Sequence, residues 1–112
     1  MTRQQLIDYH TDACGAARDL MQRKSSDYAS DADPFRNFRQ AEALGICANE
    51  LGILVRLSDK LSRLCQVVSS GRQAVLDETV NDTVLDAINY LVILSAYIHD
   101  KREVRHTEGG AE

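Results

Sequence analysis

The chain has 112 residues, of which 44% are apolar, 27% are charged and 5% are aromatic, and its formal net charge is −4. A chain of this length forms one domain and buries roughly 65% of its unfolded surface without disulfides or a structural metal. The three cysteines are widely spaced and form no C-x-x-C pair, which argues against a disulfide framework and a zinc knuckle. Mild acidity argues against general nucleic-acid binding, because that binding depends on neutralising phosphates.

No apolar run in the sequence reaches the roughly 18 residues that a membrane span requires. The N-terminal segment also lacks the uninterrupted apolar core of a signal peptide. We therefore expect a cytoplasmic protein that makes no use of a membrane.

Hydrophobic spacing predicts two helices in the first half of the chain. The first runs over residues 2–23, and Thr2 with Gln5 forms a capping box at its start. Residues 25–34 are rich in turn-forming side chains and are predicted to form a loop. A short helix follows over residues 35–44 and is ended by Gly45.

Two long helices are predicted in the second half. Residues 47–68 carry an apolar stripe at a spacing of three and four, made of Leu51, Leu54, Leu57, Leu61, Leu64 and Val68. Residues 78–101 are apolar nearly all round in their middle, a pattern typical of a helix covered on more than one side. The expected fold is therefore an all-α bundle of three longer helices and one short helix, which we expect to be oligomeric. Residues 1–101 form its single domain, and residues 102–112 form a polar, flexible tail.

Four oxygen-bearing side chains fall on one ridge of the predicted last helix: Glu78, Asp82, Asp86 and Asn89. Carboxylates four residues apart repel one another, so they favour a positive group opposite, and Mg²⁺ is the natural candidate. The alternative is that Thr79 and Asp82 cap the helix, with Glu78 interacting with its dipole. That alternative leaves Asp86 and Asn89 unexplained.

The preceding helix carries cations on one face, namely Arg56, Lys60 and Arg63, with Asp59 among them. Cations beside carboxylates of a neighbouring helix would suit a metal-bound polyphosphate. The alternative is a set of surface ion pairs between Asp59 and its arginine neighbours, each worth well under about 1 kcal/mol. Glu50, at the start of the same helix, could add a further carboxylate.

Aromatic residues flank the predicted loop. Tyr28, Phe35 and Phe38 could stack on a base while Asp27 or Asn37 reads its edge. The alternative is that the two phenylalanines pin the loop onto the core. The chain contains no glycine-rich phosphate loop.

Four motifs in this order resemble the phage and bacterial nucleotide modification associated domain 1, which is similar to the MazG-like all-α NTP pyrophosphatases. They are Lys24-x-x-Asp27-Tyr28, Phe35-x-Asn37-Phe38, Arg56-x-x-Asp59-Lys60-x-x-Arg63-Leu64, and Glu78-x-x-x-Asp82-x-x-x-Asp86-x-x-Asn89-Tyr90. The resemblance covers about residues 5–98. If the chain is phage-encoded, the expected location is the host cytoplasm.

The resemblance implies a homodimer or homotetramer with active sites between helices and often between subunits. It implies that carboxylates of two helices hold Mg²⁺, and that an activated water splits a nucleoside triphosphate into monophosphate and pyrophosphate. Carried onto this chain, the implied metal ligands are Glu50, Glu78 and Asp82, and the implied catalytic residues are Glu50 and Asp86. The implied substrate-binding residues are Lys24, Asp27, Tyr28, Asn37, Arg56, Lys60, Arg63 and Asn89.

One departure from the MazG pattern concerns its first acidic motif, Glu-Glu-x-x-Glu. Here Asn49 precedes Glu50, and Ile53 stands where the last glutamate is expected. Either fewer metal ions bind, or Glu42 or Asp59 substitutes, or hydrolysis has been lost and binding kept. The sequence therefore predicts a Mg²⁺-dependent nucleoside triphosphate pyrophosphohydrolase acting on a (deoxy)nucleotide. The alternatives are a non-catalytic oligomer that sequesters a nucleotide or nucleotide second messenger, and a helical oligomerisation module without a ligand.

Overall fold

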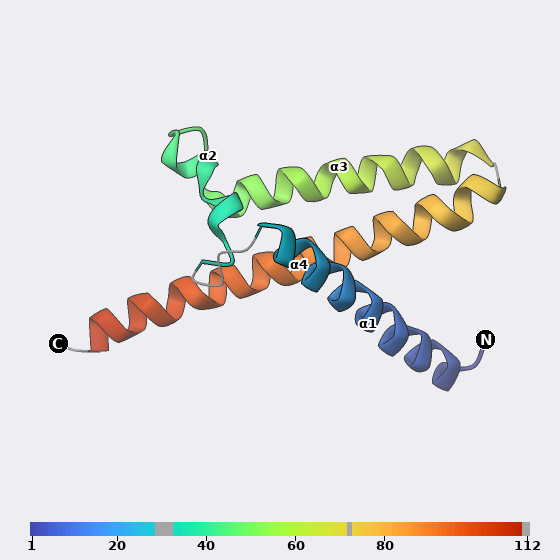
Figure 1. Cartoon of the computed structure of the whole chain (residues 1–112), viewed down its shortest axis with the longest axis horizontal. Coiled ribbons are helices and arrows are strands. Elements are labelled where there is room, and N and C mark those ends of the chain that lie inside the picture. The colour runs from blue at the N-terminus through green and yellow to red at the C-terminus, as the bar shows by residue number, and fades with distance from the viewer. Residues whose placement is uncertain (29–32, 72, 111–112) are drawn as a thin grey trace.

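The computed structural model of the chain is built from helices (Figure 1). It describes the backbone of residues 1–28, 33–71 and 73–110, and the side chains of residues 1–24, 33–71 and 80–105. In these residues there are three long α-helices, one short α-helix and one 3₁₀ turn, with no strand. The all-α prediction is confirmed. Within the same residues, no helix is long and apolar enough to cross a membrane.

The first helix, α1, spans Arg3–Tyr28 and begins with the predicted capping box. The Gln5 backbone N–H donates to Thr2 Oγ1 at 3.1 Å, and the Thr2 N–H donates to Gln5 Oε1 at 2.8 Å. The helix continues through Tyr28, past the predicted end at residue 23. Residues 24–28 contain neither proline nor glycine, so nothing in the chain stops the helix there.

The predicted short helix is two shorter turns, η1 (Arg36–Phe38) and α2 (Gln40–Ala43). Asp33 organises their start, because its carboxylate accepts a hydrogen bond from the Phe35 N–H at 3.1 Å. The segment turns back at Gly45, whose φ of 73° is a left-handed conformation that glycine adopts without strain. The predicted stop at Gly45 is therefore confirmed.

Helix α3 spans Asn49–Ser70 and ends where Gly71 takes the left-handed conformation at φ 69°. The residues of α3 that are buried are Asn49, Ile53 and Leu57. Much of the predicted apolar stripe is exposed in the single chain: Leu51 is 55% exposed, Leu54 42%, Leu61 50% and Val68 64%. These four residues are exposed because α4 covers α3 on the row beside the stripe.

Helix α4 spans Gln73–Gly110, so it begins before and ends after the predicted residues 78–101. Its earlier start places Asp82 well inside the helix, and the capping interpretation of Asp82 is wrong. On α4, Thr83 and Tyr97 are buried, and the Asn49 amide donates to the Tyr97 hydroxyl at 3.1 Å. This buried hydrogen bond ties the start of α3 to the second half of α4.

Helices α3 and α4 form an antiparallel hairpin, and α1 crosses α4 obliquely (Figure 1). Two helices therefore cover α4, as its apolar middle predicts. The first half of α1 projects away from the hairpin (Figure 1). Leu6, Ile7 and Tyr9, in this half of the helix, are all exposed. The last turns of α1 lie beside the middle of α4, where charged side chains meet.

Candidate functional site

Three helices bring one charged side chain each to the same point. The Lys24 ammonium on α1 lies 3.0 Å from Asp86 Oδ1, and the Lys60 ammonium on α3 lies 3.2 Å from Asp86 Oδ2. The side chains of Lys60 and Asp86 are only 19% and 20% exposed, whereas that of Lys24 is 57% exposed. We call Lys24, Lys60 and Asp86 the lysine–aspartate cluster.

The cluster holds Asp86 ionised. Burial acts to raise the pKa of Asp86, but the hydrogen bonds from Lys24 and Lys60 and their positive charges outweigh it, so the net pKa is lowered. A carboxylate with a lowered pKa takes up a proton poorly at neutral pH. Asp86 is therefore better suited to holding cations than to accepting a proton as a general base.

The acidic ridge was expected to face a positive group. At Asp86, that group is the pair Lys24 and Lys60. Asp82 lies one turn earlier on the same ridge and is exposed. The side chain of Glu78 lies outside the described residues. Among the described residues, no three His, Cys, Asp or Glu side chains gather closely enough to hold a metal ion by themselves.

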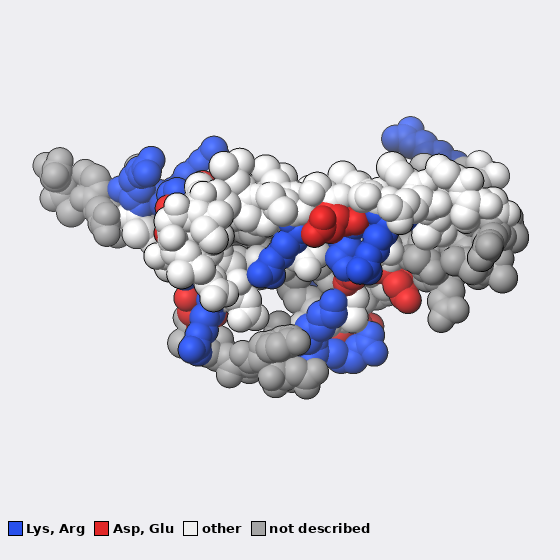
Figure 2. Space-filling view, turned by 90° about the horizontal axis from the view of Figure 1, so that it is seen from above, with Lys and Arg blue, Asp and Glu red and all other residues white. Residues whose placement is uncertain are grey.

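The cations of the predicted face have different partners. Lys60 joins the cluster, whereas Arg56 contacts the segment before α2. The Arg56 guanidinium lies 4.8 Å from the centre of the Phe38 ring and donates to the Asn37 backbone carbonyl at 3.4 Å. Arg63 is exposed. The interpretation of this face as surface ion pairs is wrong for Asp59, which pairs with neither arginine in the described part of α3. Seen from the α3 side, charged side chains gather midway along a mostly uncharged surface (Figure 2).

The two phenylalanines of the loop pack against α4. Phe38 meets Tyr90 edge to face with ring centres 6.3 Å apart, and Phe35 meets Tyr97 in the same way at 5.4 Å. These rings attach the segment after α1 to the core, as the simpler interpretation of the loop predicted. The other loop candidates, the side chains of Asp27 and Tyr28, lie outside the described residues.

Asn89 has a structural partner. Its amide donates to the backbone carbonyl of Ala17 at 3.0 Å, and Ala17 itself is 1% exposed. Since a carbonyl inside a helix normally accepts only from its own helix, this extra bond fixes α1 on α4. Asn89 therefore positions the helix that carries Lys24.

Glu50 lies at the other end of the hairpin, where its Oε2 is 3.4 Å from the Lys101 ammonium. Along the single helix α4, Asp82 and Lys101 are separated by roughly 28 Å at about 1.5 Å per residue. One chain therefore does not bring Glu50 and Asp82 to the same metal ion. A site that uses both needs a second copy of the chain.

Sequence reasoning missed the partners of both carboxylates. Lys24 and Asp86 lie 62 residues apart, and Glu50 and Lys101 lie 51 apart. Helical spacing identifies residues on one helix that share a face, but it carries no signal for pairs at this separation. No family model, curated protein or solved structure matches the chain in the comparisons made.

Proposed function

We propose that the chain binds a nucleoside triphosphate through its phosphates at the lysine–aspartate cluster. With Mg²⁺, it cleaves the nucleotide to monophosphate and pyrophosphate. The observation that carries this proposal is the convergence of Lys24, Lys60 and Asp86 from three helices. Each belongs to a different motif of the resemblance to the nucleotide modification associated domain 1. Ammonium groups bind phosphate oxygens as they bind a carboxylate, and Mg²⁺ that arrives with the phosphates would supply a counter-charge for Asp86 in their place.

The acidic ridge fits Mg²⁺ that arrives with the substrate. Mg²⁺ is commonly held by one or two carboxylates together with substrate phosphates, and Asp82 and Asp86 offer two carboxylates one turn apart. When bound, the metal would polarise the phosphoryl group and activate water. Lys60 and Arg63 would hold the phosphates. Asp86 would keep both lysines in place until the phosphates arrive.

We further propose that the working form is a homodimer or homotetramer. The radius of gyration is 17.1 Å, against about 13 Å for a compact domain of this length. The accessible surface is 8586 Å², against about 6,200 Å² for a compact monomer of this mass. The excess is comparable to the area that stable dimers bury. Much of it is apolar, on α1 and on the exposed stripe of α3.

One observation favours the alternative function, nucleotide binding without hydrolysis. Glu50, the remaining carboxylate of the first acidic motif, is paired with Lys101 and lies far from Asp82. If no carboxylate of a second helix lies beside the cluster, the chain would bind phosphates and leave them intact. The same experiment separates the two functions.

The experiment incubates the protein with Mg²⁺ and a panel of NTPs, dNTPs and cyclic nucleotides. Free ligand is then removed, the protein is denatured, and both fractions are separated by anion exchange. Monophosphate and pyrophosphate in the free fraction establish hydrolysis. An intact nucleotide recovered from the protein establishes sequestration. If neither is found, the proposal fails and the partner of the chain is still to be identified.

Variants assign the binding to the cluster. Lys60→Met should weaken triphosphate binding at least about tenfold while nucleoside binding stays unchanged, because only the phosphates contact the lysine. Arg3→Met is the matched control, since it removes an exposed cation at the start of α1. Asp82→Asn should abolish the Mg²⁺ dependence and leave the oligomer folded. Equal losses for Lys60→Met and Arg3→Met would remove the cluster from the site.

A further inference from the structure

A polar cavity lies where the end of α4 passes the start of α3. It has a volume of about 190 Å³ and is lined by Glu50, Ile98, Lys101, Arg102 and Arg105. Three cations and one carboxylate surround it, so its lining has an excess of positive charge. From Asp86 to Lys101 the rise along α4 is roughly 22 Å, which separates this cavity from the lysine–aspartate cluster.

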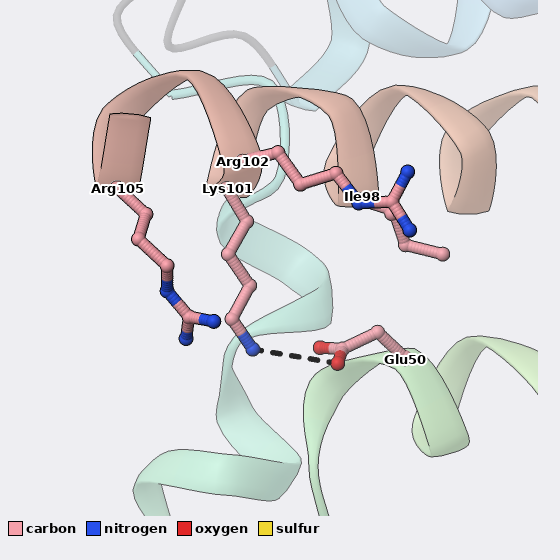
Figure 3. A pocket seen from close by; sticks show the side chains of 5 residues that line it. All are labelled: Glu50, Ile98, Lys101, Arg102 and Arg105. Atoms are coloured by element: carbon pink, nitrogen blue, oxygen red, sulfur yellow. Dashed lines mark hydrogen bonds and ion pairs between the residues drawn. The ribbon is translucent and has the colours of Figure 1, made fainter. Parts of the chain in front are cut away.

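The side chains are arranged around a space between the two helices (Figure 3). Lys101 and Arg105 reach from α4 toward Glu50, and Arg102 extends along the helix past Ile98 (Figure 3). Among the described side chains, Glu50 pairs with Lys101 at 3.4 Å, and no carboxylate pairs with Arg102 or Arg105. Cations that converge without matching carboxylates favour an anion between them.

Glu50 adds a second, independent feature. Its Oε2 pairs with Lys101, while its Oε1 is buried and accepts no hydrogen bond from the residues whose side chains are described. A buried acceptor without a donor costs free energy that a suitable partner regains. A hydroxyl group can supply that donor, whereas an anion that carries no proton at neutral pH, such as sulfate, cannot. The cavity therefore offers cations for an anion and, beside them, an acceptor for a hydroxyl.

An adjoining groove provides space for the organic part of such a ligand. It has a volume of about 480 Å³ and shares Ile98 and Arg102 with the cavity. Its other lining residues are Leu91, Leu94, Ser95 and His99. A ligand with its phosphate among the cations could lay its less polar end along Leu94 and Ile98.

We propose that this cavity binds a hydroxyl-bearing phosphate ester, a class that includes sugar phosphates and nucleotides. Lys101 and Arg105 hold the phosphate, Arg102 borders the adjoining groove, and Glu50 Oε1 accepts a hydrogen bond from a hydroxyl of the ester. The site is independent of the lysine–aspartate cluster, so the ligand can occupy it whether or not the cluster hydrolyses a nucleotide.

The test titrates the full chain with inorganic sulfate, ribose 5-phosphate and adenosine monophosphate by calorimetry. Both esters should bind at least about fivefold more tightly than sulfate, because the esters carry a hydroxyl donor for Glu50 and sulfate carries none. Arg105→Gln should weaken all three about tenfold or more. Arg3→Gln, the matched control on α1, should change them less than about twofold. A preference between the two esters distinguishes a nucleotide from a sugar phosphate.

Glu50→Ala separates the hydroxyl contact from general charge attraction, because the two predict different changes in affinity. It removes a negative charge, so sulfate should bind more tightly, yet the preference for the esters should disappear. Lys60→Met weakens phosphate binding at the cluster, so the binding that remains in this variant should still be lost when Arg105→Gln is added. Loss of binding with Lys60→Met but not with Arg105→Gln would place the phosphate in the cluster and overturn the proposal.

Three further outcomes would overturn it. They are equal losses for Arg105→Gln and Arg3→Gln, an ester preference that survives Glu50→Ala, and no saturable binding of any probe. Thermal unfolding of each variant separates loss of binding from loss of fold. Lys101→Gln is a second variant that serves if Arg105→Gln is unstable.

Discussion

Lys24 and Asp86 are 62 residues apart in the sequence, and the ammonium of the first lies 3.0 Å from Oδ1 of the second. This contact joins the end of α1 to the middle of α4. Lys60 approaches the other oxygen of the same carboxylate from α3 at 3.2 Å. Asp86 is therefore the point at which all three long helices are tied by charge.

Asp86→Asn should lower the free energy of unfolding at pH 7 by about 1–3 kcal/mol, because it leaves two lysines facing a neutral amide. The folded pKa of Asp86 is lowered, so the unfolded chain takes up a proton first as the pH falls. The stabilisation is therefore complete above the unfolded pKa of about 3.9 and is lost as the pH falls through the folded value. Urea unfolding of wild type and variant at pH 7 and pH 3 measures this difference.

Asp82→Asn is the control for this effect, since Asp82 is exposed on the same ridge. It should change the stability by less than about 0.5 kcal/mol at either pH. A wild-type advantage over Asp86→Asn that is as large at pH 3 as at pH 7 would show that the charge of Asp86 is not its source.

Ala17→Leu should loosen α1 from the hairpin. Ala17 is 1% exposed where α1 meets α4, and its carbonyl accepts from Asn89. A larger side chain there is expected to cost about 1–3 kcal/mol through overpacking. Ala16→Leu is the control, because the neighbouring Ala16 is exposed. Thermal melts followed by circular dichroism check the pair, and equal melting points would argue against this packing.

Tyr97→Phe tests the buried hydrogen bond between α3 and α4. The Asn49 amide and the Tyr97 hydroxyl are 3.1 Å apart, and both residues are buried. Removing the hydroxyl leaves the amide without this partner at an expected cost of about 1–3 kcal/mol in unfolding free energy. Tyr9→Phe, at a tyrosine that is 57% exposed, should cost almost nothing. Urea denaturation of both variants makes the comparison.

Leu61→Glu tests the proposed oligomer. Leu61 is 50% exposed in the uncovered stripe of α3, and a charge buried in an interface there would be strongly unfavourable. The variant should become monomeric with its helix content retained, as measured by analytical ultracentrifugation and circular dichroism. Ser62→Glu adds the same charge at an exposed neighbour and should leave the mass unchanged. A monomeric wild type would contradict the proposal directly.

The candidate site shows where sequence reasoning succeeds and where it stops. The spacing of Asp82, Asp86 and Asn89 predicted a shared ridge, and the ridge lies in a continuous helix. The same reasoning expected a positive group opposite the acids, and the structure supplies Lys24 and Lys60. Helical spacing gives no information on which helix would carry that group. Whether Mg²⁺ also binds there stays a prediction.

The sequence by itself determined the features that depend on neighbouring residues. These are the all-helical class, the capping box of Thr2 and Gln5, and the helix stops at Gly45 and Gly71. Hydrogen bonds within a few residues and backbone strain at single positions decide them, so the local sequence is sufficient.

Only the tertiary structure decided which face of each helix is covered and which charges meet. Leu54 and Leu57 fall on adjacent rows of α3, and packing against α4 buries Leu57 while leaving Leu54 exposed. Docking likewise pairs Asp86 with Lys24 and Glu50 with Lys101. Periodicity fixes the angle between two side chains on one helix, but the rotation of that helix against its neighbours depends on how all their surfaces pack together.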